Sequence, residues 1–150
     1  MPAATRGFDA GKKINGRKRH IVVDTLGLLL AVTVTAASVT DREAGQTLLA
    51  RLSERHWRIT RVWADGGYIG QLVDLARSIL RIALTVVKRS DGTSGFTVLP
   101  KRWLVERTFA WLMRIRRLAR DYETRADSSE AMIYWSMSMV MSRRLAKRGR

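Results

Sequence analysis

Two carboxylates stand out in a strongly basic chain, because each occupies a place where an acid could take part in phosphate chemistry. The first is Asp65, in RVWADGGYIG (61–70), where a short apolar run ends in an aspartate followed by two glycines. If the run is a strand, Asp65 lies at its carboxyl end, the edge at which open α/β sheets place their sites. The competing interpretation is a turn, because Asp-Gly is a common turn pair.

The second carboxylate is Glu106, in PKRWLVERTFAWLMRIRRLARDYE (100–123), a segment crowded with lysine and arginine. Helical spacing puts Arg102, four residues earlier, on the same face as Glu106. An ordinary exposed ion pair would explain this arrangement and would contribute little to stability. A single acid among so many cations would equally attract a divalent metal ion.

Together the two carboxylates indicate phosphoryl transfer on nucleic acid. Mg²⁺ that acts on phosphates is held by a few carboxylates, phosphate oxygens and waters. Two-metal catalysis requires such carboxylates to converge, and surrounding cations would hold the nucleic-acid backbone. The residues alone therefore suggest Asp65 and Glu106 as candidate ligands of Mg²⁺ on a bound phosphate.

The overall charge favours a polyanionic partner. The chain has 150 residues and a formal net charge of +15, from 28 Lys+Arg against 13 Asp+Glu. Such an excess favours nucleic acid, because bound phosphates release their counterions. Cysteine is absent, which excludes disulfides and zinc–thiolate sites. No secretory signal and no apolar run of the ~20 residues that a membrane span needs is visible, so we expect a cytoplasmic protein.

The hydrophobic pattern predicts an α/β layered domain. Strands are expected on both sides of a tight turn at 24–27, and again in RITRVWA and RIALTVVK. Thr40 and Glu43 form a capping box that starts a helix. Further helices are expected after Gly70, from Pro100 to about residue 120, and from Asp127, with a loop at RSDGTSG (89–95). Helices between the later strands favour some parallel pairing.

The aromatic and histidine residues give weaker signals. We expect the five tryptophans (57, 63, 103, 111 and 135) to anchor the core, which disfavours a small ribosome-associated protein. Trp103, beside Arg102, is also a candidate for DNA contact. His20 and His56 lie too far apart in the sequence to suggest a metal site, and we interpret both as ordinary surface or core residues.

At these residues the chain resembles bacterial insertion-sequence transposases of the DDE type, whose catalytic domain is ribonuclease-H-like. The matching segments are GFDAGKKINGRKRHIVVDTLGLLLAVTVTAASVTDREAG, VWADGGYIG and RWLVERTFAWLMRIRRLARDYE, in the family's order. The resemblance implies an α/β ribonuclease-H-like layered domain, with a mixed sheet and helices on both faces.

The resemblance also implies roles for individual residues. Asp65 matches the second acid of the catalytic triad, and Glu106 matches the glutamate, with Arg102 as the arginine before it. In such enzymes the triad binds two Mg²⁺ ions, water cuts DNA at the element's ends, and the freed 3′-hydroxyl attacks target DNA. The residues we expect to contact DNA are Arg17, Lys18, Arg19, Lys101, Arg102, Trp103, Arg107 and Arg114.

The chain departs from the family pattern at its start. The family's first aspartate ends a strand upstream of GRKRHIVVDTLG, and the one acid before that segment, Asp9, matches a loop instead. We therefore expect a basic N-terminal arm or loop (1–19), a partial ribonuclease-H-like domain lacking the first strand (20–126), and a C-terminal helix with a basic tail (127–150). Leu99 and Met113 replace a tyrosine and a lysine common among related transposases, and Arg114 lies next to Met113.

These departures lead to two expectations about function. The first is a DNA transposase subunit, nucleoid-associated and nearly inactive alone, which works on terminal repeats and target DNA. Its missing aspartate would come from an upstream-frame fragment, and the subunit could also form a homodimer. The alternative is a catalytically dead DNA-binding remnant that inhibits intact transposase.

Overall fold

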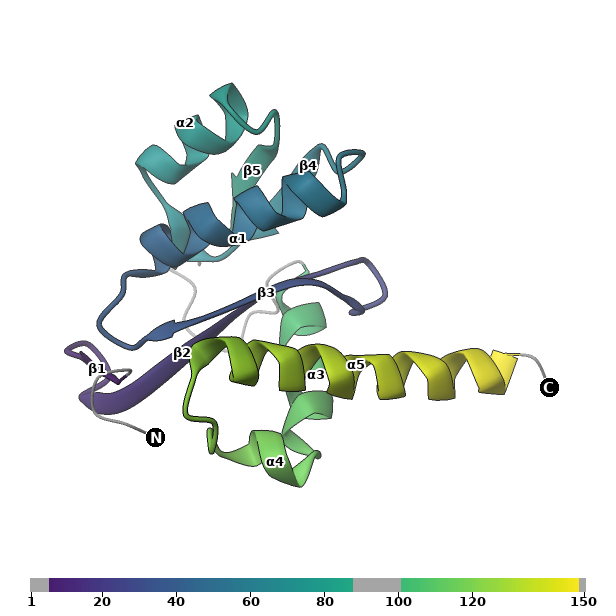
Figure 1. Ribbon diagram of the computed structural model, residues 1–150. Coiled ribbons are helices and arrows are strands. Elements are labelled where there is room, and N and C mark those ends of the chain that lie inside the picture. Colours follow the sequence, from purple (N-terminus) through teal and green to yellow (C-terminus); the bar gives the residue numbers. More distant parts are fainter. Residues whose placement is uncertain (1–5, 88–100, 149–150) are drawn as a thin grey trace, which may run out of the picture.

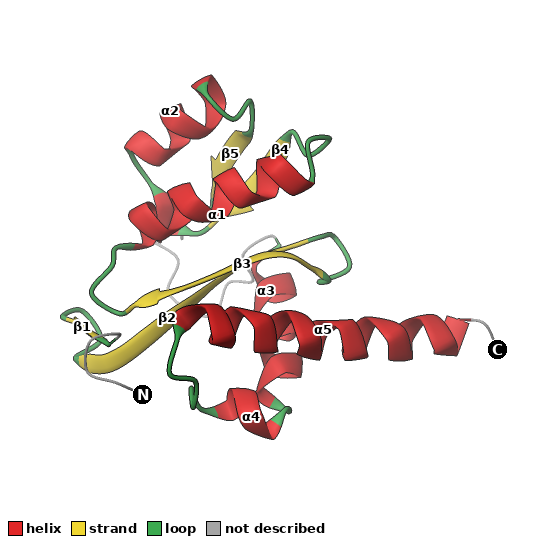
Figure 2. Cartoon of the chain, viewed as in Figure 1, coloured by secondary structure: helices red, strands yellow, loops and turns green. Residues whose placement is uncertain are grey.

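The strands form two separate sheets, flanked by helices (Figures 1 and 2). The computed structural model describes residues 6–87 and 101–148. The expected loop at 89–95 and Pro100 lie outside these ranges. The strands are β1 (Gly7–Asp9), β2 (Ile14–Val23), β3 (Leu29–Ala36), β4 (Arg61–Ala64) and β5 (Ala83–Val86). The helices are α1 (Asp41–Arg55), α2 (Gln71–Ser78), α3 (Arg102–Met113), α4 (Arg116–Ala119) and α5 (Ala126–Arg148), with a short 3₁₀ helix η2 (Gly66–Tyr68).

The centre of the fold is the antiparallel hairpin of β2 and β3, joined by the predicted tight turn. The pairing runs from Arg17 opposite Ala36 to Val23 opposite Leu29. Asp24 Oδ1 accepts hydrogen bonds from the backbone N–H groups of Leu26 and Leu28, both at 2.8 Å. Gly27 adopts φ +77°, a left-handed conformation that glycine tolerates best. The turn is therefore fixed by its own residues.

Part of the segment expected as a basic arm is strand. β1 pairs antiparallel with the first residues of β2, Gly7 opposite Gly16. Asp9 Oδ1 closes the connection by accepting from the N–H groups of Gly11 and Lys12, at 3.0 and 3.1 Å. Arg17, Lys18 and Arg19 are part of β2, and their side chains donate hydrogen bonds to carbonyl groups of neighbouring segments. Lys18 Nζ, for example, donates to the Val39 carbonyl at 3.2 Å.

The expected α/β class is confirmed, but the strands do not form one mixed sheet. β4 and β5 pair in parallel, as a two-stranded sheet apart from the three-stranded sheet β1-β2-β3. The expected ribonuclease-H-like layering and the missing first strand stay predictions. None of the described helices has the length and apolar character to cross a membrane.

Helices cover both faces of the β2–β3 hairpin, and each face has its own core cluster. α1 packs on one face and α5 on the other (Figure 1). Ala31 belongs to the cluster with α1, α2 and the parallel sheet, whereas Val32 and Val34 belong to the cluster with α3, α4 and α5. The apolar run of β3 is thus buried on both sides, as its composition predicts.

The start of α1 is as predicted, but the long helix expected further along the chain is interrupted. The capping box of Thr40 and Glu43 is present at the start of α1. The helix expected from Pro100 to about residue 120 ends at Met113, and Ile115 is extended before α4 begins. The interruption turns Leu118 into the core, where it is 2% exposed.

The tryptophans are mostly on the surface, so the prediction that they anchor the core is wrong. Trp57, Trp63, Trp103 and Trp135 are 80%, 40%, 49% and 68% exposed. Instead of packing in the core, Trp57, Trp63 and Trp103 each have a lysine or arginine over the ring. Cation–π contact lets an indole stay at the surface with a partner.

The outer edge of β3 is capped by side chains instead of by another strand. Glu130 of α5 accepts from the Val34 N–H at 2.9 Å and pairs with Arg51 of α1 at 2.7 Å. Arg51 also donates to the Val32 carbonyl at 2.8 Å, and Tyr134 accepts from the Val32 N–H at 3.4 Å. A capped edge avoids pairing with other chains.

Replacing Glu130 by alanine should lower the free energy of unfolding by about 2 kcal/mol, because the Val34 N–H and the Arg51 guanidinium both lose a charged acceptor. Chemical denaturation followed by circular dichroism measures the change. The matched control is Arg125→Ala, which removes the exposed Arg125–Asp127 pair at the start of the same helix. This control should cost less than about 0.5 kcal/mol. Equal losses for both variants would contradict the capping role.

Candidate active site

Asp65 combines the two roles that its sequence context suggests. It follows β4 directly and caps η2, with its Oδ1 accepting from the Gly67 N–H at 3.1 Å. The aspartate is therefore a turn residue. It also lines a cavity of about 830 Å³ between β2, β4, α1 and α3. The turn holds the carboxylate at the cavity wall.

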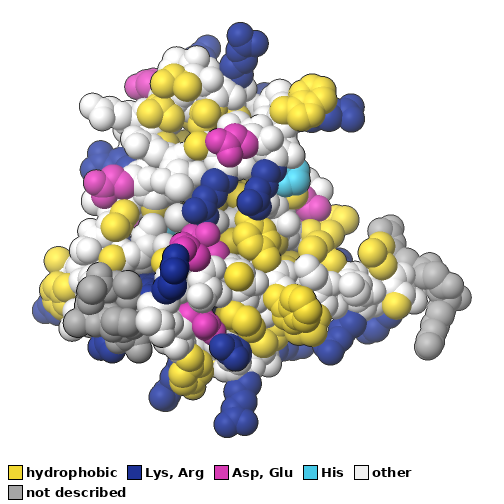
Figure 3. Space-filling view, in the orientation of Figure 1, with side chains coloured by type: hydrophobic (Ala, Val, Ile, Leu, Met, Phe, Trp, Pro, Cys, Tyr) yellow, Lys and Arg dark blue, Asp and Glu magenta, His cyan; other side chains and the backbone are white. Residues whose placement is uncertain are grey.

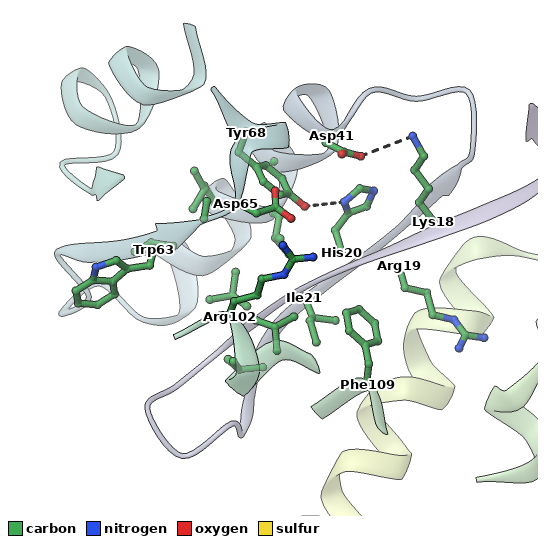
Figure 4. A pocket seen from close by; sticks show the side chains of 18 of the residues that line it. Lys18, Arg19, His20, Ile21, Asp41, Trp63, Asp65, Tyr68, Arg102 and Phe109 are labelled. Carbon is green, nitrogen blue, oxygen red and sulfur yellow. Dashed lines mark hydrogen bonds and ion pairs between the residues drawn. The ribbon is translucent and has the colours of Figure 1, made fainter. Parts of the chain in front are cut away.

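The cavity brings Asp65 together with most of the residues expected at the site. Arg102 and Glu106 line it from α3, and Lys101 lines it from the position before that helix. Arg17, Lys18 and Arg19 line it from β2. The side chains of Asp65, Tyr68 and Arg102 point into the same part of the cavity (Figure 4). Trp103, Arg107 and Arg114 are not among its lining residues. The arrangement can present carboxylates and cations to one phosphate.

Glu106 forms the expected ion pair with Arg102. Its Oε1 accepts from Arg102 Nε at 3.0 Å, and the two side chains are 63% and 56% exposed. Such an exposed pair is weak and can exchange partners. The start of α3 lies close to β4, because Lys101 Nζ lies 3.5 Å from the centre of the Trp63 ring.

A further carboxylate, which the sequence analysis missed, lies next to Asp65. An added Cβ at Gly67 would meet Asp41 Oδ2 at 2.7 Å and Asp65 Oδ1 at 3.3 Å, so both carboxylates flank this glycine. Lys18 Nζ lies 3.6 Å from Asp41 Oδ1 and 3.2 Å from Asp9 Oδ2. The available signal was the capping box, which places Asp41 in the first turn of α1.

A pair of rings, the buried His20 and the half-buried Tyr68, lies beside the carboxylates. His20 Nδ1 is 2.9 Å from the Tyr68 hydroxyl, and its Nε2 is 3.2 Å from Thr35 Oγ1 (Figure 4). Burial lowers the pKa of His20. Burial also raises the pKa of Tyr68, and Asp41 and Asp65 add to this rise. Both rings therefore stay neutral near pH 7. His20 is a core residue, as expected, but it also lines the cavity.

Several cations expected to contact DNA are engaged within the fold. Arg17, whose side chain is 1% exposed, pairs with Asp121 at 3.3 Å and donates to the Thr124 carbonyl at 2.6 Å. Arg19 donates to the Leu118 carbonyl at 2.7 Å, and burial lowers its pKa. On the face in Figure 3, lysine and arginine side chains are spread around the molecule instead of forming one patch. The assignment of individual cations to DNA stays a prediction.

The carboxylates do not form a ready-made metal cluster. Within residues 6–87 and 101–148, no group of three or more His, Cys, Asp or Glu side chains is placed to hold a metal ion. Asp65 and Glu106 line the same cavity, but Asp65 Oδ1 accepts a hydrogen bond from the Gly67 N–H and Glu106 Oε1 accepts one from Arg102.

Two comparisons with known proteins give matches. The family model described as "Transposase DDE domain" matches residues 2–141. A Burkholderia cepacia protein named "Putative transposase for insertion sequence element IS402" is 35% identical over 126 residues, 79% of this chain and 59% of that protein. The chain thus spans about three fifths of this relative's length. No solved structure matches the chain significantly.

The neighbouring glycines of η2 allow a direct test of the carboxylate arrangement. Gly67→Ala should destabilise the fold by about 1 kcal/mol, because the new Cβ displaces the Asp41 carboxylate from its place beside Lys18. Gly66→Ala is the matched control, since an added Cβ there meets nothing within 4 Å. Thermal unfolding of both variants measures the difference. A Gly66 variant that is as unstable as the Gly67 variant would show that the helix, and not the carboxylates, causes the loss.

Proposed function

Because the chain belongs to the transposase DDE-domain family, we propose that it takes part in DNA transposition, by cutting DNA at an element's ends and joining them to target DNA. The cavity beside Asp65 is the observation that carries this proposal, because Glu106 lines it from a distant part of the chain. Phosphoryl transfer requires such convergence of carboxylates, with cations nearby to hold the DNA backbone.

The donor atoms of the cavity fit magnesium that is shared with DNA. Mg²⁺ is commonly held by one or two carboxylates together with phosphate oxygens, and Asp65 and Glu106 would be the protein ligands here. When bound, the metal would polarise the phosphate and lower the pKa of a water molecule. Two-metal catalysis, as the family resemblance implies, would require a further carboxylate beside these two.

The residues of the chain have separate tasks in this proposal. The Gly67 N–H holds the Asp65 carboxylate against the cavity wall. Arg102 releases Glu106 and takes a phosphate oxygen instead, which costs little because the pair is exposed. Lys101, the residue before α3, also lines the cavity and adds positive charge there. Tyr68 and His20 stay neutral, so they add no charge beside the carboxylates.

The cavity also suggests how the site is completed. Arg17–Val23 of β2 pair with β3 on one edge, and β4 pairs with β5 on one edge. Both strands also contribute lining residues to the cavity. A further strand placed between β2 and β4 would join the two sheets into one mixed, ribonuclease-H-like sheet, and an aspartate on it would lie close to Asp65. An upstream-frame fragment or a second transposase subunit is the proposed source, and alone the chain should be nearly inactive.

A second candidate function is a DNA-binding remnant that inhibits an intact transposase. The observation that favours it is the exposed Arg102–Glu106 pair, which leaves Glu106 neutralised by a cation instead of poised for metal. The net charge of +15 would still hold the chain on DNA. In either function we place the protein on DNA in the bacterial cytoplasm, at terminal repeats.

Transposition in cells separates the two functions. The reading frame is expressed with its flanking DNA, and the movement of a marked element bounded by its terminal repeats is counted. Asp65→Asn and Glu106→Gln should each reduce the frequency by at least about 100-fold, because each removes a metal-binding charge. The matched control is Asp74→Asn, an exposed acid on α2 that does not line the cavity, and it should have no effect.

Two outcomes would change the proposal. If both carboxylate variants transpose normally, the chain is not a catalytic subunit and the DNA-binding remnant is the better interpretation. If the purified chain alone nicks supercoiled DNA efficiently with Mg²⁺, and Asp65→Asn abolishes the nicking, then the catalytic proposal holds but the need for a further strand is overturned.

A further inference from the structure

Arg107 lies within a stack of alternating indole and guanidinium groups. Its guanidinium carbon is 4.6 Å from the centre of the Trp103 ring and 4.9 Å from that of Trp111, one helical turn to either side on α3. The guanidinium carbon of Arg144, on α5, also lies over the Trp111 ring, 5.0 Å from its centre. The order Trp103–Arg107–Trp111–Arg144 thus joins two helices.

The same two arginines attach these helices to the β2–β3 turn. Arg107 Nη2 donates to the Leu26 carbonyl at 2.7 Å, and Arg144 Nη1 donates to the same oxygen at 3.3 Å. Thr108, fully buried, donates to the Gly27 carbonyl at 2.6 Å. An added Cβ at Gly27 would lie 3.0 Å from Arg107 Nη2, so the contact between turn and helix leaves no room for a side chain.

The guanidinium of Arg107 is therefore poorly placed to bind a phosphate. Its Nε is shielded from solvent without a hydrogen-bond partner in the described structure, and the indole faces beside it are the groups that compensate. Arg107 does not line the cavity, whereas its neighbour Glu106 does. Consecutive residues of a helix point about 100° apart, so fixing Arg107 and Thr108 on the turn fixes the direction of Glu106.

We propose that Arg107 is a positioning residue, which sets the rotation of α3 so that Glu106 faces the cavity, and that it does not contact DNA. This inference rests on the proposed catalytic role of Glu106. It requires the planar guanidinium, because a lysine ammonium cannot stack between two indoles and donate to Leu26 in the same way. A lysine at this position would keep the positive charge but would not hold α3 in the same rotation.

The test compares charge-conserving and charge-removing variants of the full chain. Arg107→Lys and Arg107→Gln should both lower transposition, by about 10-fold to 100-fold, because Glu106 is misplaced. Both should change the near-ultraviolet circular dichroism of the tryptophans. Neither should alter the slope of log Kobs against log[salt] for DNA binding, because no phosphate contact is lost.

Arg114, exposed at the end of α3, provides the control for the salt slope. If Arg114 contacts DNA, Arg114→Gln should reduce that slope by ~0.9 and Arg114→Lys should restore it.

A second variant guards against simple loss of folding. Gly27→Ala strains the same contact from the turn without removing a charge, and it should reproduce the loss of transposition with an unchanged salt slope. The inference is overturned if Arg107→Lys transposes normally while Arg107→Gln reduces the salt slope, since a phosphate contact would behave in that way.

Glu106→Gln, measured beside these variants, separates the positioning role of Arg107 from the catalytic role of Glu106. If it has no effect, the catalytic role of Glu106 fails and nothing remains to be positioned. If it abolishes transposition while Arg107→Lys does not, only the positioning role fails.

Discussion

Burial of the β2–β3 hairpin on both faces is the constraint on which the rest of the structure depends. Ala31 faces α1, and Val32 and Val34 face α5, so two core clusters meet at a single strand. A strand covered on both sides has no tolerance for a shift in register, because one residue of slip would exchange the clusters. The side chain of Asp24 and the conformation of Gly27 fix the turn, and the turn sets the register of β2 against β3.

The site inherits its geometry from that hairpin, although its carboxylates lie on other elements. α1 brings Asp41 to the cavity, the end of β4 brings Asp65, and α3 brings Glu106. Gly45 lets α1 approach η2, since a side chain there would collide with Leu72 and Tyr68. α3 rests on the turn through Thr108. The acidic groups are thus placed through two contacts, α1 against η2 and α3 against the turn, and each contact can be disturbed without changing a carboxylate.

The local parts of this structure were predictable from the sequence, and the long-range parts were not. The capping box of Thr40 and the strand before Asp65 depend on neighbouring residues, and both are present. The part played by His20 and Tyr68 at the cavity depends on pairing across 48 residues, for which no periodicity gives a signal. The tryptophans failed as core markers because hydrophobic size says nothing about a cation above the ring, such as Lys101 above Trp63. The basic surroundings of Asp65 and Glu106 suggested that both take part in one site, and the family resemblance made that specific.

The capped edge of β3 has a consequence for assembly. Amyloid growth and open-ended sheet polymers need a strand edge at each end, so that every added unit offers the next one a template. Here the Val32 and Val34 backbone groups on one side already have side-chain partners from α1 and α5. Extension of the sheet beside this part of β3 is therefore blocked. Because such growth must pass from one edge of each unit to its other edge, one capped edge is enough to interrupt growth through this sheet.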